Sequence, residues 1–244
     1  MKKLSHRGLS AAALKLLAIA AMFIDHFTWL FLPLYSPMGQ LLHALGRTTI
    51  PIMCFFIAEG YHKTHSIKRY AVRLAVFALV AQVPYTYFRT GEWEFFGSAF
   101  QMNVIFTLLC SLLAVWVWDT KGHTPAGWVY LFLLCLVASV GDWSAFAVLF
   151  TLAFAANRAN PSRQRLFFAV AAVFTAAFLA YSTAVQPGAP FWGGFFQFGL
   201  LLSLPLLRLY NGQRGGAAGT KWVFYLFYPL HLLVLALVYY RLLT

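Results

Sequence analysis

The sequence predicts an all-α, polytopic membrane protein: a bundle of about nine transmembrane helices with its N-terminus in the cytoplasm. Of the 244 residues, 61% are hydrophobic and only 10% are charged, and the mean hydropathy is +0.73. Soluble domains carry about 25% charged residues, so most of this chain is expected to lie in the bilayer. The net charge is +12, but the basic residues fall in short segments between apolar runs. Membrane loops have this pattern, so we expect membrane lipid and no nucleic acid as a partner.

Nine apolar segments can be drawn as spans, and we expect them to form a single domain over residues 1–244. The first is long enough to cross a hydrocarbon core of about 30 Å, at about 1.5 Å per residue. It is too long for the core of a signal peptide, so we expect it to be permanent. The fifth and sixth are short and are separated only by Gly141 and Asp142; a bent hairpin that does not reach both surfaces is the alternative. The segments are about 9–34, 40–60, 67–88, 102–118, 126–140, 143–156, 166–185, 194–210 and 222–243.

The basic residues predict the orientation. With the N-terminus inside and alternating crossings, 13 Lys and Arg residues fall on the cytoplasmic side and two on the outer side. Cytoplasmic loops of membrane proteins carry such an excess, and an odd number of spans then places the C-terminus outside. The inner residues are Lys2, Lys3, Arg7, Lys63, Lys68, Arg69, Lys121, Arg158, Arg163, Arg165, Arg208, Arg214 and Lys221, and the outer residues are Arg89 and Arg241.

Polar residues in the outer half of the spans are candidates for function. A charged side chain at hydrocarbon depth costs on the order of 3 kcal/mol on insertion scales, so it needs a partner or a wet cavity. Asp25 and His26 lie at a depth similar to that of Arg47, and an Asp25–Arg47 ion pair would relieve two buried charges at once. Gln82 and Asn103 belong to the same half. One structural hydrogen bond between helices is the alternative for Asp25 and His26.

A second polar set lies toward the cytoplasm. Lys15 and Arg73 are about two turns into their spans, Glu59 ends the second span, and His231 follows Pro229 in the ninth. Each has a structural alternative. The two long cations can reach the lipid headgroups, Glu59 can be an ordinary helix-end residue, and His231 can satisfy a backbone group freed by the proline.

The cytoplasmic segment 210–216 combines small residues with flanking arginines. Backbone N–H groups that small residues leave accessible can hold a phosphate. The segment lacks the Walker and GxGxxG patterns, and a flexible basic loop is the alternative. Cys54, Cys110 and Cys135 lie inside apolar runs without metal-ligand spacing, so no metal is predicted.

A set of short motifs follows in order over nearly the whole chain: Leu14-Lys15, Asp25-His26, Gly46-Arg47, Glu59-Gly60, Gln82-Val83-Pro84, Asn103 to Thr107, Asp142-Trp143, Leu209 to Gly215 and Phe224 to Leu232. Together these motifs resemble the TraX family. The seventh span carries little of the pattern, and Cys54 stands where Phe is expected. The resemblance implies a bacterial inner-membrane acetyltransferase that moves an acetyl group from cytoplasmic acetyl-CoA to an acceptor at or across the membrane. In the family's namesake the acceptor is the N-terminal amine of conjugative pilin.

As an acetyltransferase, the chain would use its polar residues in the following roles. His26 is the first choice of general base and His231 the second, because imidazole is suited to take a proton near neutral pH. The donor phosphates would lie near Arg214 and the 211–216 loop. The predicted catalytic residues are Asp25, His26, Arg47, Glu59 and His231; the predicted acetyl-CoA contacts are Lys15, Arg73, Tyr210, Asn211, Gly212, Arg214 and Tyr228; and Arg47, Gln82 and Asn103 are candidates for stabilising the oxyanion.

Two other functions agree with the same sequence features. A small transporter or channel could use the same polar residues, although transporters often have inverted repeats and none is apparent here. A non-catalytic assembly factor for a pilus or secretion apparatus is the other. The acceptor also remains open between a pilin-like peptide and another amine or hydroxyl.

The predicted topology can be tested with reporter fusions. Fusions after Tyr35 and Thr244 should report the outside, and fusions after Thr64 and Ser162 the cytoplasm, because of the 13-to-2 distribution of basic residues. A cytoplasmic C-terminus would contradict nine crossings and would mean that the fifth and sixth segments together make one span or a re-entrant pair.

Overall fold

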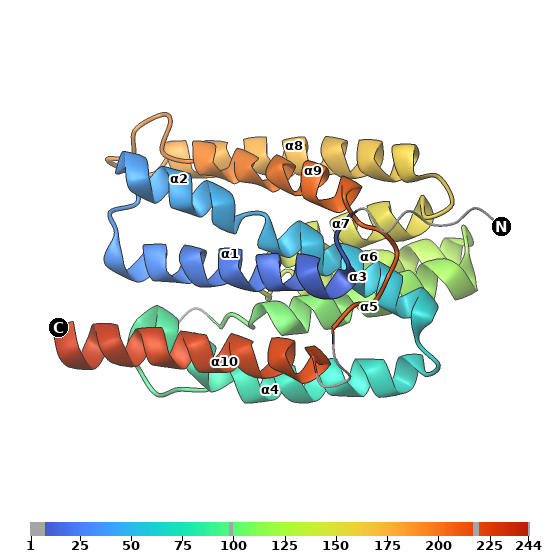
Figure 1. Ribbon diagram of the computed structural model, residues 1–244, viewed down its shortest axis with the longest axis horizontal. Helices are drawn as coiled ribbons and strands as arrows, with labels where there is room; N and C mark the ends of the chain where they lie inside the picture. The colour runs from blue at the N-terminus through green and yellow to red at the C-terminus, as the bar shows by residue number, and fades with distance from the viewer. Residues whose placement is uncertain (1–7, 98–99, 217–219, 244) are drawn as a thin grey trace. The chain divides into compact units, whose positions relative to one another are not determined.

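The computed structural model describes residues 8–97, 100–216 and 220–243, and every regular element in these ranges is helical (Figure 1). The predicted all-α class is therefore confirmed. The elements are α1 (Ala11–Phe31), α2 (Pro37–Gly46), α3 (Thr49–Lys63), α4 (Ile67–Thr90), α5 (Val104–Lys121), α6 (Pro125–Ala138), α7 (Ser144–Ala156), α8 (Pro161–Ala184), the 3-10 helix η1 (Phe195–Leu202), α9 (Ser203–Arg208), α10 (Thr220–Val238) and the π-helical η2 (Tyr239–Leu243).

Six helical stretches among the described residues are long and apolar enough to cross a membrane. Three more are apolar but shorter: Pro125–Ala138, Ser144–Ala156 and Phe195–Arg208. A helix of about 14 residues reaches only about 21 Å, less than the hydrocarbon core. All nine predicted segments therefore contain helix, but the number of crossings and the N-in orientation stay predictions. The basic residues Lys2, Lys3 and Arg7 lie outside the described residues. The six stretches are Ala11–Phe31, Pro37–Lys63, Ile67–Thr90, Val104–Lys121, Pro161–Ala184 and Trp222–Leu243.

The chain forms two compact units, each built from separated stretches of sequence. The first unit contains Met1–Met53 and Ala172–Phe227, and the second contains Cys54–Ala171 and Tyr228–Thr244. The first unit thus combines α1 and α2 with η1 and α9. The second contains α4 to α7.

Hydroxyl and amide side chains fix where several helices begin. The first N–H groups of a helix have no partner inside the helix, and a capping side chain accepts from one of them. Pro37 and Pro125 occupy the first helical positions of α2 and α6, where the missing N–H is not needed. The caps are Ser10 for α1, Ser36 for α2, Ser66 for α4, Asn103 for α5 and Thr124 for α6.

The second predicted span, 40–60, is not one continuous helix. It is interrupted at Arg47 and Thr48, between α2 and α3. Pro51 has no N–H to donate to the carbonyl of Arg47. The hydroxyl of Thr48 also donates to the carbonyl of Leu45, at 2.7 Å, and such local bonds compete with the helix. The break puts Arg47 at a turn rather than inside a regular helix.

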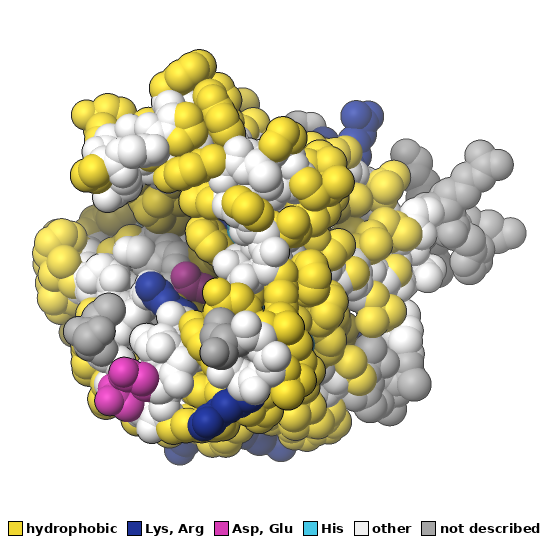
Figure 2. Space-filling model, turned by 90° about the vertical axis from the view of Figure 1, so that its left-hand side faces the viewer, with side chains coloured by type: hydrophobic (Ala, Val, Ile, Leu, Met, Phe, Trp, Pro, Cys, Tyr) yellow, Lys and Arg dark blue, Asp and Glu magenta, His cyan; other side chains and the backbone are white. Residues whose placement is uncertain are grey.

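Large apolar side chains cover the outside of the molecule. Val170 and Phe174 of α8 and Phe132 of α6 are each more than 60% exposed. Figure 2, which looks onto the left-hand end of the view in Figure 1, shows hydrophobic side chains over much of that face and few charged groups. Large apolar side chains that are exposed on one helix mark a contact surface, so the outer faces of α6 and α8 are suited to contact lipid.

Candidate active site

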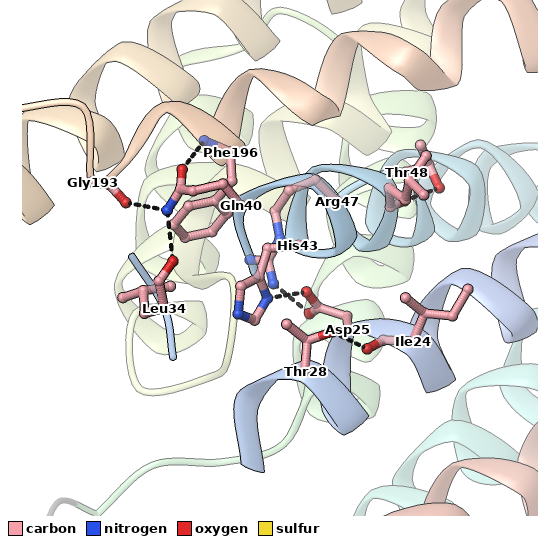
Figure 3. Close-up of polar contacts among 11 residues, drawn as sticks. Ile24, Asp25, Thr28, Leu34, Gln40, His43, Arg47, Thr48, Gly193 and Phe196 are labelled. Atoms are coloured by element: carbon pink, nitrogen blue, oxygen red, sulfur yellow. Dashed lines mark hydrogen bonds and ion pairs between the residues drawn. The ribbon is translucent and has the colours of Figure 1, made fainter. Parts of the chain in front are cut away.

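Asp25 is the centre of a buried polar group in the first unit (Figure 3). Its Oδ1 accepts a hydrogen bond from Nδ1 of His43 at 2.8 Å, and its Oδ2 accepts from Nη2 of Arg47. All three residues are buried, with His43 fully enclosed. The predicted contact between Asp25 and Arg47 is thus confirmed, and His43 is a partner that the sequence analysis missed.

The spacing of residues on α2 explains this arrangement. His43 and Arg47 are four residues apart, and side chains at that spacing lie on the same face of a helix. Both can therefore reach one carboxylate on α1. This i, i+4 spacing of a histidine and an arginine within an apolar segment was the signal in the sequence that could have identified His43.

Two aromatic rings enclose the imidazole of His43. The ring of Trp29 on α1 lies 4.5 Å away between centroids, and the ring of Phe196 on η1 lies 5.2 Å away. The guanidinium of Arg47 lies 5.4 Å from the centroid of Phe196, at a distance typical of cation–π contacts. The packing therefore restricts both the imidazole and its neighbouring cation.

Gln40 holds η1 in this position. Its Nε2 donates to the carbonyls of Leu34 and Gly193, both at 2.9 Å, and its Oε1 accepts from the N–H of Phe196 at 3.3 Å. Figure 3 shows Gln40 between these groups, one helical turn before His43 on α2. One amide side chain thus ties the segment that carries Phe196 to the helix that carries His43.

The second ring nitrogen of His43, Nε2, is buried and has no hydrogen-bond partner among the described residues. Because a carboxylate only accepts hydrogen bonds, Nδ1 carries the proton that faces Asp25, and Nε2 holds the lone pair. A buried acceptor without a partner costs about 1–3 kcal/mol. An imidazole that a carboxylate orients through one nitrogen, while the other nitrogen is not hydrogen-bonded, is an arrangement that general bases use.

His26, the predicted base, lies beside this group rather than in it. It is only partly buried, and successive residues of an α-helix point about 100° apart. The hydrogen bonds that hold Asp25 come from His43 on α2 and from Arg47, the residue that follows α2. The role of His26 as a base is not tested by this geometry and stays a prediction.

Gln82 and Asn103, the predicted oxyanion donors, form a network in the second unit. The Oε1 of Gln82 accepts from both the N–H and the Nδ2 of Asn103, at 3.1 and 2.9 Å. The Nε2 of Gln82 donates to the carbonyl of Gln101, and the Nδ2 of Asn103 donates to that of Ala78. These bonds fasten the start of α5 to α4, so both amides have a clear structural task.

Glu59 also has partners in the second unit. Its carboxylate contacts Nζ of Lys63 at 2.7 Å and Nε of Arg158 at 3.4 Å. His231 and Tyr228 of α10 are buried, and their ring centroids lie 5.9 Å apart. The structure therefore divides the predicted catalytic set, with Asp25, His26 and Arg47 in the first unit and Glu59 and His231 in the second.

Most of the predicted acetyl-CoA contacts gather at the N-terminal end of α1, in the first unit. Lys15 lies over the ring of Phe224, 5.4 Å from its centroid, Tyr210 is half-buried, and Arg214 is exposed. Gly212 has a left-handed backbone, with φ of 79°, which glycine adopts readily. Asn211 belongs to the same loop, whereas Arg73 and Tyr228 belong to the second unit.

The loop contributes carbonyl groups to α1. The N–H groups of Ala11 and Ala12 donate to the carbonyls of Gln213 and Arg214, at 2.8 and 3.0 Å. The N–H of Leu9 likewise donates to the carbonyl of Leu209, at 2.7 Å. The start of α1 is therefore occupied by the loop itself, and a phosphate would have to meet the side chains of the loop rather than the first N–H groups of this helix.

A chain with six membrane-length helices and a buried carboxylate–imidazole–guanidinium group is a polytopic membrane protein with a candidate reaction centre. It belongs to the TraX family: a family model described as TraX protein matches residues 10–239. The resemblance found in the sequence is confirmed. The chain is also similar to the probable fimbrial assembly protein FimC, serogroup H1, of Dichelobacter nodosus. The two are 32% identical over 233 residues, which cover 93% of this chain and 94% of that protein. No solved structure matches the chain.

The buried ion pair predicts that Asp25→Ala destabilises the chain more than Asp25→Asn does. Asp25→Ala should lower the free energy of unfolding by about 3–5 kcal/mol, because it removes the carboxylate that pairs with the buried guanidinium of Arg47. Asp25→Asn keeps one acceptor oxygen and should cost less. Thermal unfolding of the purified chain in detergent, followed by circular dichroism, measures the difference. Asp119→Ala, which removes a single acceptor from the Tyr61 hydroxyl, is the control. Equal losses of unfolding free energy in Asp25→Ala and Asp25→Asn would contradict a stabilising contact between Asp25 and Arg47.

Proposed function

We propose that the chain is an integral inner-membrane acetyltransferase that uses cytoplasmic acetyl-CoA and a histidine base. The observation that carries the proposal is the buried imidazole of His43, whose Nδ1 faces Asp25 and whose Nε2 lacks a hydrogen-bond partner among the described residues. The family relationship supports the reaction, since the TraX resemblance implies acetyl transfer. A pilin-like peptide agrees with the printed name of the relative, a fimbrial assembly protein.

In the proposed reaction, Nε2 of His43 takes the proton of the attacking amine or hydroxyl. The attacking atom forms a bond to the thioester carbonyl carbon, and the carbonyl oxygen becomes an oxyanion. When the tetrahedral intermediate collapses, the carbon–sulfur bond breaks and the proton passes from the imidazolium to the leaving CoA sulfur. Asp25 orients the ring and stabilises its positive charge during the reaction.

This proposal makes His43 the first choice of base in place of His26. A base needs a fixed orientation toward the proton that it removes. Asp25, Trp29 and Phe196 together fix the ring of His43. His26 and His231 are the alternatives that the same assay compares.

The proposed donor site lies at the N-terminal end of α1, where Lys15, Tyr210 and Arg214 gather. Lys15 and Asp25 are ten residues apart on α1, about 15 Å along the helix axis. The pantetheine arm of CoA has a comparable length. Phosphates held at the cytoplasmic end of α1 would then allow the acetyl group to reach the depth of Asp25 and His43.

Acetyl transfer can be tested with radiolabelled acetyl-CoA and inverted membrane vesicles. His43→Ala should lower kcat by a factor of about 10² to 10⁴, the usual contribution of a general base, with a smaller change in the KM for acetyl-CoA. Label should appear on a protein or glycan acceptor, which mass spectrometry can identify. If His43→Ala is active at the wild-type rate while His26→Ala is not, the base is His26.

The donor site predicts a different kinetic result. Arg214→Ala should raise the KM for acetyl-CoA with a smaller change in kcat, because a phosphate contact acts equally in the ground state and the transition state. Arg163→Ala, an exposed arginine at the start of α8, is the matched control. An unchanged KM in Arg214→Ala would leave the loop as a connector and direct the search to Lys63, Lys68 and Arg69.

A non-catalytic assembly factor is the second candidate, because the relative's printed name describes an assembly protein. The same vesicle experiment separates the candidates. Transfer of label to an acceptor supports the enzyme, and uptake of label without transfer supports a transporter. If label is neither transferred nor taken up, and cells that lack the chain have a pilus defect, the result supports an assembly factor.

A further inference from the structure

Gly46, in the last turn of α2, lies directly against Asp25. The three heavy atoms nearest to a Cβ built on Gly46 all belong to the Asp25 side chain: Cβ, Cγ and Oδ1. A real Cβ at this position would overlap them. Gly46 is not among the glycines with a left-handed backbone, so the backbone conformation does not require glycine here. Glycine is required because the carboxyl group of Asp25 lies so close.

The position of Gly46 between its neighbours matters for the buried group. His43, Gly46 and Arg47 share one face of the α2 region, because they are spaced at i, i+3 and i+4. The Asp25 side chain has only two torsions, yet its oxygens reach His43 and Arg47 at the same time. It can do so because its Cβ lies on the helix surface between the two partners, where no other side chain stands.

We infer that Gly46 is a positioning residue for the Asp25–His43 pair, an inference that rests on the proposed function only for its kinetic consequence. A methyl group at position 46 moves the carboxylate of Asp25 away from α2. The long side chain of Arg47 can follow it. The ring of His43 cannot, because it is packed between Trp29 and Phe196. An added methyl group therefore separates the carboxylate from the imidazole and spares the ion pair.

The test is Gly46→Ala in the full-length chain in detergent micelles, with ¹⁵N-labelled histidine. In the wild type, the NMR signal of His43, assigned by its loss in His43→Gln, should show one neutral tautomer with the proton on Nδ1. In Gly46→Ala both tautomers should appear, and kcat should fall about tenfold or more with an unchanged KM for acetyl-CoA. Gly60→Ala is the matched control, because the three heavy atoms nearest to its Cβ all belong to the side chain of Tyr70, and it should keep the wild-type tautomer.

A wild-type tautomer in Gly46→Ala would overturn the inference, whatever the activity. A shifted tautomer with full activity would support the positioning role and contradict His43 as the base, so the two proposals can fail separately. If Gly46→Ala does not fold, the variant Asp25→Glu tests the inference instead. This variant keeps the charge but moves the carboxylate by one methylene, so it should keep the contact to Arg47 and lose the single tautomer of His43. A single tautomer in Asp25→Glu would overturn the inference.

Discussion

The burial of one carboxylate, that of Asp25, constrains most of the first unit. An ionised group inside an apolar helix is stable only if charge and hydrogen bonds compensate its lost hydration. Each oxygen of Asp25 has a partner on the α2 side, so α2 has to lie close to α1. The packing of η1 on α2 through Gln40 then covers the imidazole. Several local features of the sequence, including the glycine at 46 and the proline at 51, serve this one requirement.

The two ring nitrogens of His43 differ in their contacts. The Nδ1 of His43 contributes to the compensation of Asp25, whereas its Nε2 contributes nothing to it and is buried without a partner among the described residues. A buried imidazole nitrogen without a protein partner can accept one further hydrogen bond, from a ligand or from an ordered water molecule.

The sequence predicted the parts of this structure that follow from hydropathy and depth. The apolar segments identified every helix region, and the depths of Asp25 and Arg47 identified their contact. Hydropathy alone does not decide whether α6 and α7 cross the membrane, since these short helices are as apolar as the longer ones. His43 was missed because neutral histidine does not interrupt an apolar segment as an aspartate does. Depth likewise placed Gln82 and Asn103 in the same half, but only the fold shows that the two amides bond each other.

The order in which the first unit is synthesised follows from its discontinuous sequence. Asp25, His43 and Arg47 belong to the first two helices, and they can meet as soon as this hairpin enters the membrane. Gln40 and its partner Gly193 are 153 residues apart, and translation at about 5–20 residues per second separates them by about 8 to 30 s. During that interval η1 does not yet exist, so only contacts within the first two helices and the turn after them surround the Asp25 carboxylate. The imidazole is enclosed only near the end of biosynthesis, when Phe196 reaches it.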